Sequence, residues 1–143
     1  MRRKILLLIS IISIVLSGCG NDADSLNDGW NYSPSADPVV SVESAIQGEI
    51  EKEYCRAITL HSASVSADYT ETVIEQYQNY KEGWTKDFLT THMVAVYAVY
   101  TADFDGTKTP LRSGKLERIF IMLLNDDTKV WEIWDNTTSS LIS

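Results

Sequence analysis

The sequence predicts an α+β domain with the element order helix, strand, helix and then three strands. Two segments repeat apolar residues every three or four positions, which is typical of helices that bury one face. The last third of the chain is instead rich in Val, Ile, Tyr and Trp and is interrupted by turn residues, which is typical of an antiparallel sheet. We expect one domain at residues 39–136, preceded by a flexible stalk at 19–38 and followed by a tail at 137–143.

The first helix is predicted to begin at Asp37-Pro38, because Asp is a good N-cap and Pro fits the first helical position. Gly48 lies inside this segment and weakens the helix by ~1 kcal/mol relative to Ala. The predicted buried face is Val39, Val42, Ile46, Ile50 and Tyr54.

A strand and a second helix are predicted next. Residues 55–67 shift towards alternation of apolar and polar side chains, as in a half-buried strand. Asp68 is expected to cap the second helix and Gly83 to end it, before a short turn at residues 85–89. The predicted buried stripe of this helix is Tyr69, Val73, Tyr77, Tyr80 and Trp84, with Ile74 beside it.

Three strands are predicted at the end of the chain. Residues 93–104 are apolar at both alternating sets of positions, so this strand is covered on both faces or lies centrally in a sheet. Residues 105–114 form a long hairpin loop to a second strand at 115–124. The turn signal Asn125-Asp126-Asp127 then leads to an aromatic third strand at 130–135.

The first residues of the chain predict export. Arg2, Arg3 and Lys4 precede an apolar run at residues 5–16, which as a helix spans about 18 Å at ~1.5 Å per residue. This is short of the roughly 30 Å of a bilayer core, so the run is too short for an ordinary transmembrane helix. A basic start, a short apolar run and small residues are the secretory pattern.

The segment Leu16-Ser17-Gly18-Cys19 resembles the lipobox of bacterial lipoproteins. The resemblance implies cleavage before Cys19 and acylation of Cys19, which anchors the protein to the outer, extracytoplasmic face of the cell membrane. Several acyl chains on one residue are sufficient for stable anchoring. The alternative is a plain signal peptide in which the cysteine is accidental.

Removal of residues 1–18 leaves a strongly acidic chain. It takes away three basic residues and no acidic one, so the formal net charge changes from −8 to −11. Such a surface repels phosphate backbones, and nucleic acid is not an expected partner. Once Cys19 is acylated, only Cys55 remains, so no internal disulfide is expected and the apolar core must hold the domain together.

The domain resembles the nuclear transport factor 2-like, or cystatin-like, fold, in which a curved sheet wraps helices to form a cone. The residues that carry the likeness also resemble an uncharacterised domain of Gram-positive lipoproteins and membrane-bound regulators, over residues 39–136. They are Met93-Val94-Ala95-Val96-Tyr97-Ala98-Val99-Tyr100, Asp105-Gly106-Thr107-Lys108-Thr109-Pro110, Ser113-Gly114 and Trp131-Glu132-Ile133-Trp134-Asp135. No defined activity comes with that domain.

Two motifs raise the question of a metal site. Asp103-Phe104-Asp105-Gly106 matches part of a calcium loop, but with Gly106 at the sixth position the twelfth is Arg112, where a carboxylate is required. A strand end followed by an Asp-Gly turn is the better interpretation. His61 and His92 show no diagnostic ligand spacing. We expect no metal and no cofactor.

Two features of the sequence bear on catalysis: the cysteine Cys55 and the resemblance to the cone fold. No general base lies near Cys55 in the sequence, so it is interpreted as a small core residue. Some relatives of the cone fold are isomerases or dehydratases that use a polar residue inside the cone. The candidates for such a lining are His92, Tyr97, Tyr100, Asp103, Trp131 and Trp134. Strand alternation places Tyr97 and Asp103 on one face and Tyr100 on the other, so the favoured interpretation is that the aromatic residues fill the core.

The leading hypothesis is a lipid-anchored binding or accessory module without catalytic residues. Its expected partners are the membrane, through the anchor, and either another envelope protein or a small apolar ligand. The alternative is a small-molecule enzyme, of the isomerase or dehydratase kind, that uses a cone-shaped cavity. A third interpretation is a regulatory sensor domain related to those of larger membrane proteins.

Overall fold

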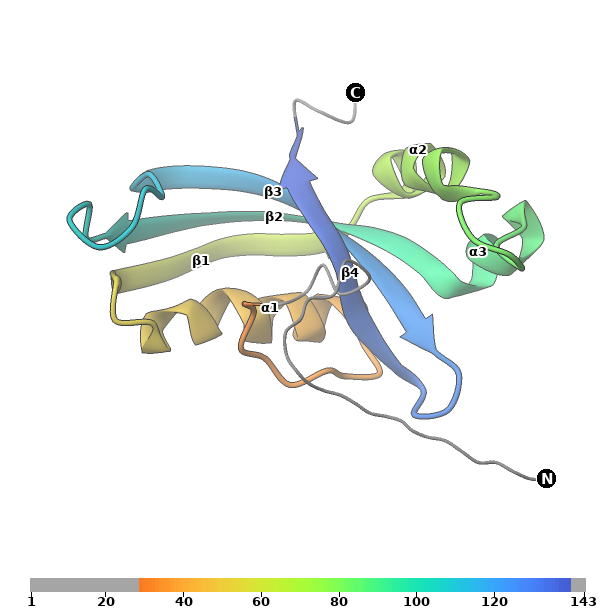
Figure 1. The fold of residues 1–143 in the computed structure, drawn as a ribbon, viewed down its shortest axis with the longest axis horizontal. Helices are drawn as coiled ribbons and strands as arrows, with labels where there is room; N and C mark the ends of the chain where they lie inside the picture. The colour runs from red at the N-terminus through yellow and green to blue at the C-terminus, as the bar shows by residue number, and fades with distance from the viewer. Residues whose placement is uncertain (1–28, 140–143) are drawn as a thin grey trace.

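One four-stranded antiparallel sheet in the order β1-β2-β3-β4 forms the centre of the computed structural model, which describes residues 29–139. The strands are β1 (Cys55–Val65), β2 (Met93–Phe104), β3 (Gly114–Asn125) and β4 (Val130–Thr138). The helices are α1 (Pro38–Gly48), the 3-10 turn η3 (Glu49–Glu51), α2 (Ala67–Tyr77) and α3 (Lys86–His92) (Figure 1). The fold is α+β as predicted. The order differs, because α3 is a helix where a short turn was expected.

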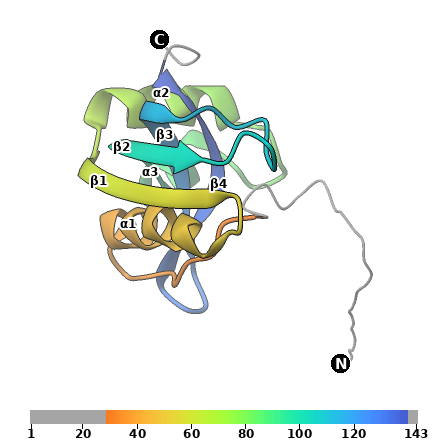
Figure 2. The same cartoon turned by 90° about the vertical axis from the view of Figure 1, so that its left-hand side faces the viewer.

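The sheet is covered by helices on both faces (Figure 2). Alternate residues of β2 point to opposite sides. The set that faces α1 is buried from Val96 to Phe104, whereas the other set is buried at Met93 and Ala95 and becomes half-buried or exposed from Tyr97 to Asp103. Val96, Ala98 and Tyr100 belong to the cluster beneath α1, whereas Met93 and Ala95 belong to the cluster beneath α2 and α3. The sequence predicts that residues 93–104 form a strand that is covered on both faces or lies centrally in a sheet. The central position is confirmed, because β2 lies between β1 and β3, whereas burial on both faces is limited to the start of the strand.

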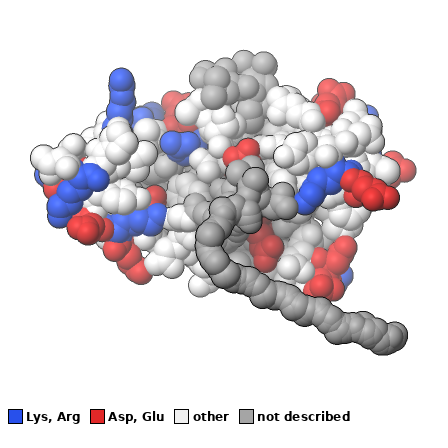
Figure 3. All heavy atoms as spheres, in the orientation of Figure 1, with Lys and Arg blue, Asp and Glu red and all other residues white. Residues whose placement is uncertain are grey.

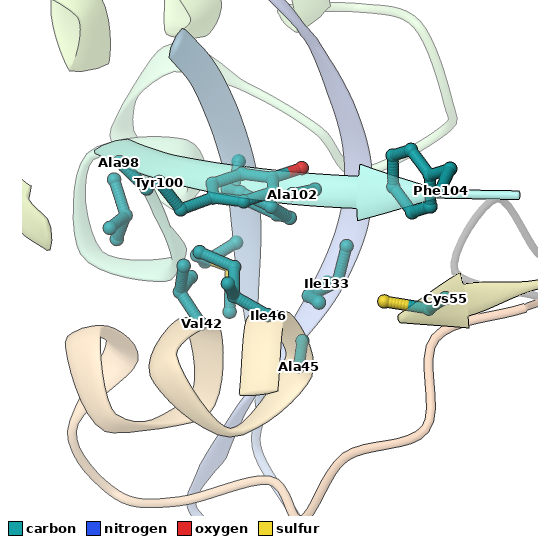
Figure 4. Close-up of a cluster of buried hydrophobic side chains, with 12 residues drawn as sticks. Val42, Ala45, Ile46, Cys55, Ala98, Tyr100, Ala102, Phe104 and Ile133 are labelled. Atoms are coloured by element: carbon teal, nitrogen blue, oxygen red, sulfur yellow. The ribbon is translucent and has the colours of Figure 1, made fainter. Parts of the chain in front are cut away.

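The α1 face holds the larger cluster of buried side chains. Val42, Ala45 and Ile46 point from α1 towards the sheet, where they meet Ala98 and Ile133 (Figure 4). Each fully buried Val or Ile side chain contributes roughly 1.5–3 kcal/mol through loss of apolar contact with water. The start of α1 is also as predicted, because Asp37 is the N-cap and its Oδ1 accepts a hydrogen bond of 2.9 Å from the Val39 amide.

The end of α1 corrects the predicted buried face. The helix ends at Gly48 and the chain tightens into η3, so the periodicity of the helix no longer applies to Ile50. Ile50 is 47% exposed. The residue turned inwards instead is Glu49.

Both predicted ends of the second helix were wrong. Ser66, not Asp68, is the N-cap, and its side chain accepts from the Tyr69 amide at 3.2 Å. The helix ends at Tyr77, because Asn79 adopts the left-handed conformation with a φ of 68°. Tyr80 therefore leaves the predicted stripe and is 61% exposed.

Residues 29–37, which the sequence assigns to the stalk, lie against the domain. Trp30 packs edge-on against Phe120 with ring centroids 5.2 Å apart. The Ser35 carbonyl accepts a hydrogen bond of 2.8 Å from the Trp131 amide, in an isolated antiparallel bridge. The Ser41 hydroxyl accepts from the Ser35 amide at 2.8 Å and donates to the Trp131 carbonyl at 2.9 Å, so it ties this segment to both α1 and β4. At the other end, β4 continues to Thr138, past the start of the predicted tail.

The predicted leader, the lipobox with Cys19 and residues 20–28 lie outside the described residues. The predictions made for them are therefore unchanged by the structure.

Gly48 is required by the close passage of residues 29–37. A Cβ at this position would collide with the backbone carbonyl of Asn31. Gly48→Ala would add helix propensity worth about 1 kcal/mol, but we expect the collision to dominate and to lower the free energy of unfolding by about 1–3 kcal/mol. Urea denaturation measures the change.

Gly106→Ala is the matched control, because a Cβ at Gly106 meets nothing within 4 Å. We expect its free energy of unfolding to stay within about 0.5 kcal/mol of the parent value. A Gly48→Ala variant more stable than the parent would show that the Asn31 segment does not pack as described.

Candidate functional site

A cavity of about 360 Å³ opens on the α1 face of the sheet, beyond the end of α1. Its size is within the range of small-molecule sites. Its walls come from the segment before α1, from η3, from β2, β3 and β4, and from the loop between β2 and β3. They are formed by Trp30, Glu49, Tyr100, Phe104, Pro110, Leu111, Arg112, Leu116, Arg118 and Asn136.

The strand register explains why these side chains share one face. Tyr100 pairs with Leu116 across β2 and β3, and two residues further along β3, Arg118 pairs with Ala98. Asn136 of β4 pairs with Phe120 of β3, which belongs to the same face. The α1 helix ends before it reaches this part of the sheet, so the loop at residues 105–113 and Trp30 close the cavity instead.

Asp105 organises the loop. Its Oδ1 accepts hydrogen bonds from the Thr107 hydroxyl at 2.6 Å and the Thr107 amide at 3.0 Å, and these bonds lower the pKa of the carboxyl group. Arg56 lies 3.5 Å from the same oxygen. The Asp105 carboxylate thus makes its contacts within the turn that follows β2 and with the start of β1. This agrees with the interpretation of residues 103–106 as a strand end and a turn.

Tyr100 forms the buried floor of the cavity. It is 2% exposed, and burial raises the pKa of its hydroxyl, while the nearby Arg118 guanidinium acts in the opposite direction. A phenol with a pKa above its ordinary value of 10 is protonated at neutral pH. Tyr100 is therefore suited to donate a hydrogen bond to a ligand and unsuited to act as a base.

Glu49 and Arg118 bring opposite charges to the wall. Glu49 is 8% exposed, and its Oε1 lies 3.2 Å from the Lys52 ammonium. Among the described residues, no group donates a hydrogen bond of good geometry to that oxygen. Arg118 is half-buried and donates one hydrogen bond, of 2.9 Å, to the Asn136 side-chain oxygen. The guanidinium is also a hydrogen-bond partner of the Tyr100 hydroxyl, which leaves at most three of its five N–H groups for other contacts.

Cys55 lies close to the cavity but is not activated. Burial raises the pKa of its thiol, and the nearest hydrogen-bond acceptor is the Ala57 carbonyl at 3.7 Å. A nucleophilic cysteine needs a lowered pKa. Cys55 belongs to the α1-face cluster, as the sequence interpretation proposed.

The predicted lining residues do not converge. Tyr100 alone of the six lines the cavity, while Trp131 packs against the core of the same face. Tyr97 lies on the opposite face, where it stacks on Tyr69 and donates to Glu117 at 2.6 Å. Asp103 is exposed near Ser113. Trp134 and His92 belong to two further clusters, described below.

Sequence reasoning missed Trp30, Glu49, Arg112 and Arg118. One signal for Arg118 was present, since it occupies an otherwise apolar alternate set on β3 that includes Leu116, Phe120 and Met122. A basic residue in such a set must either reach solvent or meet a polar partner. Trp30 and Glu49 reach the cavity only through the fold of their segments.

His92 links α3 to the β3–β4 turn. Its Nε2 lies 2.9 Å from Asp126 Oδ1, and its Nδ1 lies 2.9 Å from the Phe88 carbonyl. The Thr91 hydroxyl lies 2.8 Å from the same Nδ1, so the ring is held between α3 and the turn by contacts at both nitrogens. His61, by contrast, contacts Thr101. Within residues 29–139, no group of three or more His, Cys, Asp or Glu side chains is arranged to hold a metal ion.

An aromatic cluster covers the other face beside α2. Trp84 and Trp134 pack edge-on with centroids 5.1 Å apart, and the Lys81 ammonium lies 5.0 Å from the Trp134 ring centroid. Tyr77 adds a hydrogen bond of 3.1 Å from its hydroxyl to Asp135. Burial and the Asp135 charge raise the pKa of Tyr77 to about 12. The cluster joins the end of α2 to β4.

The Tyr77 hydroxyl gives a prediction for alkaline pH. In the unfolded chain it ionises near its ordinary value of 10, while in the folded chain it stays neutral until about 12. Its contribution to stability is therefore complete below pH 10 and is lost as the pH rises towards 12. We expect the tyrosinate absorbance difference between the parent and Tyr77→Phe to titrate with a midpoint near 12. A midpoint near 10 would contradict the buried contact with Asp135.

Comparison of the chain with protein-family models, with curated proteins and with solved structures finds no match. In the described part of the chain, no helix has the length and apolar character needed to cross a membrane.

Proposed function

We propose that this protein is a lipoprotein, anchored by an acylated Cys19 on the extracytoplasmic face of the cell membrane, whose domain binds a small and largely apolar molecule. The observation that carries the binding role is the cavity beyond the end of α1. It combines apolar and aromatic walls with a few polar side chains, which is the usual composition of a ligand site.

Binding is favoured over catalysis by the chemistry of the cavity wall. Tyr100 is held in its neutral form by burial, and the Cys55 thiol is held in its unreactive form. The residues considered for a catalytic lining are divided between the two faces of the sheet. The isomerase or dehydratase alternative therefore gains no support from the geometry.

We extend the proposal to the family of the domain, the nuclear transport factor 2-like or cystatin-like fold. A helix that runs along one face of a twisted antiparallel sheet supports it (Figure 1). The placement of α2 and α3 on the opposite face departs from a cone that wraps all its helices (Figure 2).

The proposed anchor and the cavity are linked through residues 29–37. Trp30 belongs to the segment that follows the predicted anchor, and it also forms one wall of the cavity. The same segment is held to β4 through Ser35 and Tyr32. A ligand in the cavity would therefore contact the part of the domain nearest to the membrane tether in the sequence.

The binding role is tested by saturation-transfer NMR with a library of small organic fragments. The acylated full-length protein is used in lipid nanodiscs, with empty nanodiscs as the blank. We expect some fragments to receive saturation from the parent protein. Leu116→Trp fills the cavity and should abolish these signals, because Leu116 lines its wall.

Val65→Trp is the matched control, since Val65 is exposed at the far end of β1 and away from the cavity. Its fragment signals should equal those of the parent. If no fragment responds, or if the signals survive in Leu116→Trp, the cavity is not a binding site.

The anchor is tested by substitution of the two cysteines in turn. Cys19→Ala should release the protein from the membrane fraction and remove the acyl mass seen by mass spectrometry, because the thiol carries the first lipid. Cys55→Ala is the control, because Cys55 is a core residue. It should leave both measurements unchanged. Retention of Cys19→Ala on the membrane would show that the N-terminal segment anchors the protein in another way.

A further inference from the structure

Arg118 is unusual among the described basic residues, because it is half-buried and lacks an acidic partner. Three arginines lie within residues 29–139, and Arg56 pairs with Asp105 at 3.5 Å. Neither Arg112 nor Arg118 has a carboxylate within ion-pairing distance in that part of the chain, although 20 acidic residues occur in the whole sequence. Both of these arginines line the cavity.

The wider charge distribution favours an anion at this end of the molecule. Lys and Arg side chains gather around the end that carries the 105–113 loop (Figure 3). Six of the nine described basic residues lie just before β1, at its start, in the loop or in the first half of β3: Lys52, Arg56, Lys108, Arg112, Lys115 and Arg118. Three of the six are paired with carboxylates, Lys52 with Glu49, Arg56 with Asp105 and Lys108 with Glu53. In a chain with a net charge of −8, this is the region where a negatively charged ligand is least repelled.

The cavity wall offers a matching set of donors. The Arg118 guanidinium is planar and has N–H groups left after its bond to Asn136, which suits a two-point contact with a carboxylate. The Tyr100 hydroxyl lies close to Arg118 and is protonated at neutral pH. Arg112 is exposed at the edge of the cavity, where it would attract the ligand before binding.

The rest of the wall limits what the anion can be. Trp30, Phe104 and Leu116 are apolar, so the body of the ligand must be apolar as well. Glu49 adds a buried negative charge that Lys52 already neutralises. A second negative charge on the ligand would lie near the buried Glu49, and the one further cation of the wall is Arg112, which is exposed at the edge of the cavity. This favours a single negative charge over a phosphate with two.

From these contacts we propose that the cavity binds a small apolar monocarboxylate. The carboxylate lies on Arg118 and the Tyr100 hydroxyl, and the apolar body lies between Trp30, Phe104 and Leu116. This inference rests on the proposed function, since it names the class of ligand for the same cavity.

The test compares three probes of one size by isothermal titration calorimetry on the acylated full-length protein in nanodiscs of zwitterionic lipid. They are 3-phenylpropionate, its neutral analogue 3-phenylpropanamide, and phenyl phosphate. We expect the carboxylate to bind roughly tenfold or more tightly than the amide, as a hydrogen bond to a charged group allows. Phenyl phosphate should bind more weakly than the carboxylate.

Arg118→Gln removes the charge and keeps a side chain able to bond Asn136. It should reduce the affinity for 3-phenylpropionate by about tenfold or more and leave that for 3-phenylpropanamide within about twofold. Arg118→Lys keeps the charge without the planar fork and should give an intermediate loss. Lys115→Gln is the matched control, because it makes the same charge change on the same strand but on the opposite face. Lys115 contributes to the charge of this end of the molecule but does not line the cavity, so the variant should bind all three probes within about twofold of the parent.

The outcomes separate this inference from the proposed function. Equal affinity for the carboxylate and the amide, or tighter binding of phenyl phosphate, overturns the monocarboxylate while leaving the cavity a ligand site. If none of the three probes binds but the cavity binds other fragments, the monocarboxylate is likewise overturned and the cavity remains a ligand site. If no fragment binds the cavity, both proposals fall. The comparison of the probes on the parent protein decides the question even if the Arg118 variants do not fold.

Discussion

The central position of β2 in the sheet is the constraint on which the rest of the structure depends. One face of this strand is buried from Val96 to Phe104 in the cluster beneath α1. On the other face, Met93 and Ala95 are buried beneath α2 and α3, so the chain supplies helices for both faces. The two clusters are separated by the sheet and meet different helices. Because the strand is central, its neighbours β1 and β3 extend the same two faces, and the register of each pair decides which side chains lie on which face.

The cavity follows from a difference in length. The α1 helix has 11 residues and is about 16 Å long at 1.5 Å per residue. A strand of 12 residues, such as β2, spans about 40 Å at 3.4 Å per residue. One helix cannot cover the whole face, and the remainder is covered by Trp30, η3 and the 105–113 loop. These segments pack less regularly than a helix and leave space between them. The polar wall residues lie at that boundary, where Glu49 directly follows α1 and Arg118 interrupts the apolar set on β3.

Much of the fold could be predicted, because local signals agree with the tertiary contacts in the strands. The bounds of β2 match those expected from its apolar residues, and Asp37-Pro38 correctly marks the start of α1. The predicted helix ends are wrong where two residues could each cap or end the same helix. Asp68 is a good cap by type, but Ser66 comes first and already satisfies the Tyr69 amide. Gly83 would end a helix, but Asn79 turns the chain four residues earlier. The residues that line the cavity were harder to predict, because Trp30 and Glu49 meet β2 only after distant segments of the chain fold together.

The packing of residues 29–37 has one more consequence, for contact between separate molecules of this protein. β4 is an edge strand that carries Trp131, Ile133 and Trp134, and such an edge can recruit a strand from another chain. Two of its outward amides are already occupied, because Trp131 donates to the Ser35 carbonyl and Ile133 donates to the Tyr32 hydroxyl. A polar, proline-containing segment thus seals the most aromatic edge of the sheet. The residues that the sequence assigned to a stalk thus occupy the β4 amides with which a strand of another molecule would otherwise pair.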